Sequence, residues 1–211
     1  MRRRDVLVNS RVAVDVSDGM PVKGKGCIRI ATGNIMTMHP KLCHSGPLAQ
    51  QGIGQRGAIL QRQLVEFDVD AAGLQEGRLQ KDLQTRGESY HVRTSAADSS
   101  GRYGSQCWVR DSELVSIGAS VPVCPRICYT MMRSGGVNFA NVSAHAPCRD
   151  SKPAVRAEFW TSLSRVLHDV VHKKHADVTI LCIDANGRVG SLKCLEHHRR
   201  GIPNQQNCLH W

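Results

Sequence analysis

The sequence lacks any long run of apolar residues. No stretch approaches the roughly 18 consecutive apolar side chains of a membrane-spanning helix, and "MRRRDVLVNSR" at the N-terminus ends its apolar run after three residues. A secretory signal needs a longer apolar segment. Internal repeats and low-complexity blocks are also missing, which argues against a repeat architecture. We therefore expect a protein that is not secreted and has no membrane partner.

The cysteines do not form the pattern of a disulfide framework. There are nine of them, an odd number, and they are scattered along the chain. Cys107 and Cys182 fall inside apolar runs, where a free cysteine behaves as a small apolar residue. A reducing compartment fits this usage best, so we expect an intracellular protein, nuclear or cytoplasmic.

Acidic residues are fewer than basic ones, 18 against 28, and the formal net charge of +10 favours an anionic partner. Half of this excess lies in residues 1–26 and 191–211, so the central part of the chain is only mildly basic. The charge therefore suggests nucleic acid without establishing it. With 211 residues, 41% of them hydrophobic, the chain has the size of one domain with a real core.

Apolar periodicity predicts three regions. Residues 1–26 form a loosely structured basic leader with a candidate short strand at 11–16, residues 27–190 form the domain, and residues 191–211 form an irregular tail. Within the domain, a helix at 58–67 would place Ile59, Leu60, Leu64 and Phe67 on one face, and the clearest helix covers 152–175 with a continuous apolar stripe. Strands are expected at 27–35, 69–76, 90–96, 105–111, 113–123, 126–133, 137–147 and 178–184, with a hairpin at 99–105. Helices between runs of strands predict an α/β sandwich.

Four of these strands end in polar residues of a catalytic type. They are Asn34, Glu76, His145, and the pair Asp184 and Asn186. Each alone is more commonly a turn or cap residue, but strand ends at one edge of a sheet are where side chains converge into sites. Carboxylates, amides and an imidazole suit a hard cation such as Mg²⁺ together with a phosphate.

Five motifs, "RIATGNI", "AAGLQEGRL", "GRYGSQCWV", "NFANVSAHAP" and "ILCIDANGRVG", occur in this order over residues 27–190. In that order the chain resembles the endonuclease/exonuclease/phosphatase superfamily, and within it the endonuclease domains of non-LTR retroelements and their domesticated relatives. The resemblance implies a four-layer αββα sandwich that hydrolyses phosphate esters, as a DNA endonuclease linked to reverse transcription, with Mg²⁺ or Mn²⁺.

The resemblance also implies roles for individual residues. Glu76 corresponds to the metal-binding carboxylate, and Asn34 supports it at the metal site. His145 would lie near the scissile phosphate, Asp184 would orient or deprotonate the attacking water, and Asn186 would hydrogen-bond the phosphate.

Two further residues are candidates for contacts with nucleic acid. Arg78 corresponds to a position that often approaches the nucleic-acid backbone. Tyr103, at the tip of the expected hairpin, contacts a nucleic-acid groove or is an ordinary turn aromatic, and the sequence leaves both readings open.

The chain departs from the family pattern in two places. Gly33 stands where the family has a tryptophan, and the family's second aspartate and Ser-Asp-His segment are not found in the 211 residues. We therefore expect a truncated copy without the final strands and with crippled activity. Two alternatives remain: a catalytically inactive remnant that binds nucleic acid non-specifically, and a phosphomonoesterase of the same superfamily. No obligatory protein partner is inferred.

Four other patterns are weaker candidates for chemistry. "HDVVHKKH" at 168–175 places histidines one helical turn apart, but a solvated basic face is the favoured reading over a metal site. "CPRIC" at 124–128 and Cys107 are read as packed thiols. "CLEHH" at 194–198 matches no zinc-finger spacing.

Overall fold

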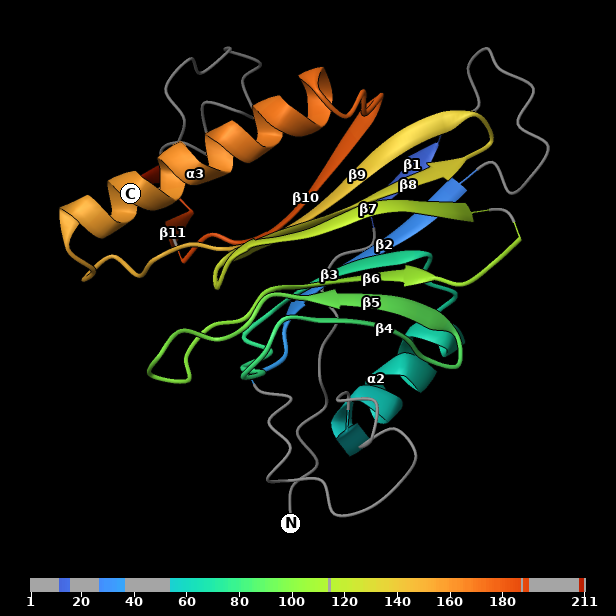
Figure 1. Ribbon diagram of the computed structural model, residues 1–211, viewed down its shortest axis with the longest axis horizontal. Coiled ribbons are helices and arrows are strands. Elements are labelled where there is room, and N and C mark those ends of the chain that lie inside the picture. The colour runs from blue at the N-terminus through green and yellow to red at the C-terminus, as the bar shows by residue number, and fades with distance from the viewer. Residues whose placement is uncertain are drawn as a thin grey trace.

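The computed structural model describes residues 12–15, 27–36, 54–113, 115–186, 188–189 and 209–210. Most of these residues form two large β-sheets that face each other, with one helix on the outer side of each sheet (Figure 1). The order of layers is therefore helix, sheet, sheet, helix, which confirms the predicted αββα sandwich.

The first sheet has six strands in the order β1-β2-β3-β6-β5-β4. β2 and β3 are parallel and α2 connects them, whereas the other neighbours are antiparallel. The hairpin expected at 99–105 is the connection between β5 and β6. The elements of this half are β1 (Val12–Asp15), β2 (Cys27–Asn34), α2 (Gly54–Glu66), β3 (Ala71–Gln75), β4 (Leu83–Arg86), β5 (Tyr90–Thr94) and β6 (Gln106–Arg110).

The second sheet has four strands in the order β10-β9-β8-β7. β9 and β10 are parallel, joined by α3, and the hairpins β7–β8 and β8–β9 are antiparallel. Its elements are β7 (Val115–Cys124), β8 (Ile127–Ser134), β9 (Val137–His145), α3 (Pro153–His172) and β10 (Val178–Asp184). A separate two-stranded pair joins β11 (Arg188–Val189) to β12 (Leu209–His210).

Three apolar clusters hold the layers together. Leu60 and Leu64 of α2 pack against the first sheet beside the buried Trp108. Phe159, Leu163, Val166 and Val170 of α3 pack on the second sheet. A third cluster, which includes Ile30, Val109, Met132 and Phe139, lies between the sheets. Each sheet is thus covered on its outer face by a helix.

The predicted inward face of α2 was partly wrong. Leu60 and Leu64 are buried, but Ile59 is 56% exposed and Phe67 is 51% exposed. The helix begins at Gly54, and its buried positions 57, 60, 61 and 64 follow the helical spacing. Ile59 lies next to this stripe but outside it, and Phe67 comes after the last residue of α2. Neither side chain therefore reaches the core.

The other predicted elements lie where the sequence placed them, and β4 was not predicted. On α3, Val171 is one of the apolar residues of the stripe predicted within 152–175, but its side chain is 41% exposed. The leader and tail lie mostly outside the described residues, apart from β1, which pairs with β2, and β12. The prediction that the final strands are missing concerns residues after 190, most of which also lie outside the described residues. No helix in the described part is both long and apolar enough to cross a membrane.

Candidate active site

Two pairs of parallel strands deliver polar side chains to one place. Asn34 is the last residue of β2 and Glu76 follows β3, in the first sheet. His145 ends β9 and Asp184 ends β10, and these two residues are directly paired across the second sheet. Parallel strands end at the same edge of a sheet, so the sandwich brings the four ends together.

The amide of Asn34 bridges the two carboxylates. Its Nδ2 lies 2.9 Å from Glu76 Oε1 and 3.3 Å from Asp184 Oδ2, while its Oδ1 accepts a hydrogen bond from the backbone N–H of Met36 at 3.0 Å. Asn34 therefore fixes one carboxylate from each sheet and presents its nitrogen to them.

His145 lies beside the same carboxylates. Its Nε2 is 3.8 Å from Glu76 Oε1 and 3.9 Å from Asp184 Oδ2, and its side chain is only 6% exposed. Burial lowers the pKa of His145 below its ordinary value, although the charges of Asp184 and Glu76 oppose this shift. Its buried Nδ1 has no hydrogen-bond partner among the described residues. The imidazole is thus held neutral at neutral pH, next to two carboxylates.

Glu76 is also held by Arg78, whose Nη2 lies 2.5 Å from Glu76 Oε2. Burial alone would raise the pKa of Glu76, but hydrogen bonds from Asn34 and Arg78, with the charges of Arg78 and His145, lower it overall. The Glu76 side chain is therefore ionised at neutral pH. In this arrangement Arg78 contacts the carboxylate at the centre of the site.

Asn186 closes the turn after β10. Its backbone N–H donates to Asp184 Oδ1 at 3.1 Å, and its side-chain Nδ2 donates to the Ala146 carbonyl at 2.7 Å. Asp184 and Asn186 therefore shape the turn after β10 and also belong to the candidate active site. Gly187, the other half of the predicted Asn-Gly turn signal, lies outside the described residues.

Tyr103 is half-buried and packs on His145, so it does not project from the hairpin tip. The two rings meet edge to face with centroids 5.6 Å apart. The Arg126 guanidinium lies 3.5 Å from the centre of the Tyr103 ring, and its Nη1 donates to the His145 carbonyl at 2.9 Å. Sequence reasoning missed Arg126, because the turn between β7 and β8 carries no signal that associates it with His145.

Backbone strain is concentrated around this site. Seven described residues other than glycine have positive φ, and five of them lie here: Met36, Glu76, Arg78, Tyr103 and Asn186. Such backbone costs about 1–3 kcal/mol per residue and persists where the surroundings enforce it. The enforcing contacts include hydrogen bonds from Arg78 N to the Tyr103 carbonyl and from Gly77 N to the Gly104 carbonyl, both 2.8 Å long. The strain supports a functional interpretation of this edge.

Buried polar residues lock the strands behind the site. Gln75 Nε2 lies within hydrogen-bond distance of Ser143 Oγ at 3.2 Å and the Cys182 carbonyl at 3.0 Å. Ser143 in turn donates to the Leu74 carbonyl at 2.9 Å. These contacts join β3, β9 and β10 immediately before Glu76, His145 and Asp184, so the spacing of the site depends on a rigid contact between the sheets.

The donor set fits a hard divalent cation. Mg²⁺ binds through one or two carboxylates, with water and substrate in the other positions, and Glu76 and Asp184 supply carboxylates on either side of one amide nitrogen. No cluster of three or more His, Cys, Asp or Glu side chains suited to a metal occurs in the described part of the chain. A cation held here would therefore rely on the few oxygen ligands typical of Mg²⁺ or Mn²⁺.

The remaining cysteine candidates have packing roles. Cys107 and Cys128 are buried, with their sulfurs 3.5 Å apart, and burial raises the pKa of Cys128 well above its ordinary value. A protonated, buried thiol is unreactive, which agrees with the packed-thiol interpretation. "CLEHH" lies outside the described residues.

No protein-family model and no curated protein sequence matches the chain. The human Nocturnin catalytic domain, solved with a bound sulfate anion, is 15% identical with a TM-score of 0.53, over 89% of this chain and 72% of that one. The chain shares the fold of that domain. It is also similar to an endonuclease/exonuclease/phosphatase family protein from Bacteroides thetaiotaomicron, at 16% identity with a TM-score of 0.46 over 76% of this chain and 64% of that one.

The chain is also similar to the solved endonuclease domain of TRAS1, a telomere-specific non-LTR retrotransposon. It is 18% identical with a TM-score of 0.46, over 71% of this chain and 68% of that domain. At these identities the similarity concerns the fold alone, so the chemistry has to be argued from the site itself.

Proposed function

We propose that the chain hydrolyses phosphodiester bonds in nucleic acid, DNA in the first place, with a divalent cation. The observation that carries this proposal is the Asn34 amide, which bridges a carboxylate of one sheet to a carboxylate of the other. Two carboxylates beside a neutral imidazole match what metal-assisted attack of water on a phosphate requires.

Glu76 would hold the cation, with Asn34 orienting its carboxylate. The cation would neutralise the phosphate and stabilise charge on the leaving oxygen. Asp184 would orient the attacking water and accept its proton. His145, neutral because of its burial, would donate a hydrogen bond from Nε2 to a phosphate oxygen. Asn186 fixes the position of Asp184 through its backbone N–H.

Positive side chains at the rim support a polyanionic substrate. The guanidinium groups of Arg126 and Arg102 both lie over the Tyr103 ring, at 3.5 and 5.5 Å from its centre. Arg78 contacts Oε2 of the Glu76 carboxylate, whereas Asn34 donates to Oε1 of the same group. With the overall charge of +10, these groups favour a chain of phosphates over a single small anion.

A second candidate is binding of nucleic acid without cleavage. The observation that favours it is the Glu76–Arg78 pair, because Arg78 contacts the carboxylate that the cation needs. An arginine that stays in place would exclude the metal while keeping a basic surface.

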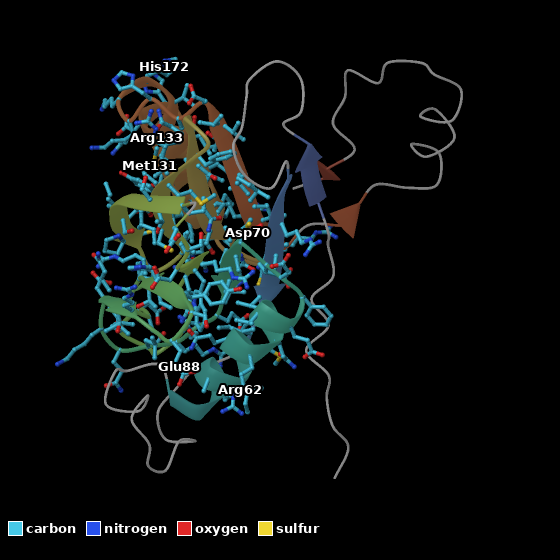
Figure 2. The ribbon with its side chains drawn as sticks, turned by 90° about the vertical axis from the view of Figure 1, so that its right-hand side faces the viewer. Arg62, Asp70, Glu88, Met131, Arg133 and His172 are labelled. Carbon is cyan, nitrogen blue, oxygen red and sulfur yellow. The ribbon has the colours of Figure 1, made fainter. Side chains whose placement is uncertain are left out.

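Nicking of supercoiled plasmid by the full chain with Mg²⁺ or Mn²⁺ tests the proposal. The variants are Glu76→Gln, which removes the charge but keeps the shape, and Glu88→Gln, the same change at an exposed residue of the turn between β4 and β5, which Figure 2 labels. We expect Glu76→Gln to be slower by on the order of 100-fold and Glu88→Gln to match the wild type.

The remaining outcomes separate the alternatives. Equal nicking by wild type and Glu76→Gln would refute hydrolysis at this site. DNA binding that weakens steeply with salt, with no nicking in either protein, would establish the binding-only function. Faster release of phosphate from a monoester than nicking of plasmid would favour a phosphomonoesterase.

A further inference from the structure

The histidines of "HDVVHKKH" lie outside the candidate active site and have no part in the proposed function. They lie in the last two turns of α3 and just after its end. Figure 2 shows His172 at the end of the molecule opposite to α2 and Arg62. α3 begins after β9, whose end carries His145, and finishes before the start of β10. The histidines therefore lie toward the opposite end of the second sheet from the candidate active site.

Two of these histidines form a pair on one face of α3. His168 and His172 are four residues apart, which places them one above the other on a helix, and their ring centroids are 4.4 Å apart. Both side chains are exposed, His168 to 63%. His175 lies beyond the end of the helix and has positive φ, so it is not part of this face.

The surroundings of His168 leave one ring nitrogen available. Its Nδ1 lies 3.5 Å from Asp169 Oδ1, and Asp169 is itself held by Lys173 at 2.9 Å. A carboxylate on one imidazole nitrogen is the arrangement that orients the other nitrogen toward a metal.

The end of the helix favours a cation at this position. The last carbonyl groups of α3 give its C-terminus a partial negative charge, and the pair lies within its last two turns. The Asp169–Lys173 ion pair reduces the repulsion that Lys173 would exert on a bound cation. The local charge is thus compatible with metal binding.

We propose that His168 and His172 together bind one late first-row transition ion, Zn²⁺, Ni²⁺ or Cu²⁺, with water completing its coordination. Two imidazole nitrogens select these ions over Mg²⁺, which prefers oxygen. Asp169 is a positioning residue that holds the His168 ring. This site is separate from the oxygen-donor site at Glu76 and does not depend on the proposed hydrolysis.

The experiment records the backbone amide signals of the full chain by NMR at increasing concentrations of free Cu²⁺. A glycine buffer sets the free Cu²⁺ concentration at each step. Paramagnetic Cu²⁺ broadens signals near the bound ion, so the position of the broadened amides distinguishes binding at α3 from binding at other histidines of the chain. The variants are His168→Ala, His172→Ala and the matched control His175→Ala. All three residues are exposed, and circular dichroism checks that the helix is kept.

We expect amides in the last two turns of α3 to broaden first in the wild type and in His175→Ala. His168→Ala and His172→Ala should each need at least tenfold more free Cu²⁺ for the same broadening, because a single imidazole cannot chelate. The proposal is overturned if either of these variants broadens at the wild-type concentration, or if His175→Ala weakens binding as much as they do.

Discussion

At the scale of single residues, His145 shows how the site controls charge. Burial lowers its pKa, the charges of Asp184 and Glu76 raise it, and those of Arg126 and Arg78 lower it again. In metal-free protein we expect the His145 ring to titrate below the ordinary imidazole value of about 6.5. Asp184→Asn should lower this pKa further, because it removes the largest opposing effect.

The titration is measured by NMR of the imidazole signals between about pH 4.5 and pH 8.5, roughly two units on either side of the ordinary value. Asp150→Asn, a change at an exposed aspartate in the loop before α3, is the control and should leave the titration unchanged. A His145 pKa at or above the ordinary value would contradict the described burial.

The same shift has a consequence for stability. As pH falls below about 6.5, the unfolded chain takes up a proton at His145 before the folded protein does. The unfolded state then binds more protons, so this residue makes the fold less stable as pH falls toward the lowered pKa. A thermal unfolding series should show a smaller acid loss in His145→Gln than in the wild type, and an equal loss would contradict the account.

Four of the site residues could be found from the sequence because each ends an apolar run. Asn34, Glu76, His145 and Asp184 were grouped by that pattern, and the structure places them together. Arg126 could not be found in this way. It lies in the turn between β7 and β8, and only the pairing of β8 with β9 brings it to the His145 carbonyl.

At the scale of elements, α2 tests which face of a helix holds the sandwich. Leu64 is 1% exposed and packs against the first sheet, whereas Ile59 is mostly exposed. We expect Leu64→Ala to reduce the free energy of unfolding by about 2–5 kcal/mol. Ile59→Ala should change it by less than about 0.5 kcal/mol. Urea denaturation measures both, and similar losses would contradict the described orientation.

Contact between β3 and β10 gives a second test. A Cβ on Gly73 would lie 2.2 Å from the Cβ of Cys182, whereas a Cβ on Gly33 would meet no atom within 4 Å. We therefore expect Gly73→Ala to destabilise the fold by about 1–3 kcal/mol or more. Gly33→Ala, the matched control, should be close to neutral in the same denaturation experiment. A neutral Gly73→Ala would show that the sheets are not in such close contact.

The sequence predicts elements better than it predicts the faces that they bury. The helix at 152–175 and most strands were recognised from periodicity, because long amphipathic or apolar segments carry a strong signal. The short strand β4 was missed, since "LQTR" has one large apolar residue in four. Ile59 and Phe67 were assigned to the core because apolar character alone does not say where a helix starts and ends.

At the scale of the whole molecule, the fold explains why residues far apart in sequence become one site. Two parallel strand pairs, one in each sheet, end at the same edge, and Asn34 joins carboxylates that are separated by more than a hundred residues. The sequence resemblance predicted this sandwich. It could not predict that Arg78 would hold Glu76 or that Tyr103 would pack on His145.

The central claim is that Glu76 and Asp184 act as one metal-dependent site. The most direct measurement is the rate of phosphodiester hydrolysis with Mg²⁺ by the wild type, Glu76→Gln, Asp184→Asn and the double variant. Residues that act as a unit give effects that do not multiply. We predict that each single change removes most of the activity, on the order of 100-fold, and that the double variant is hardly slower. A wild type no faster than Glu76→Gln, or losses that multiply in the double variant, would contradict the claim.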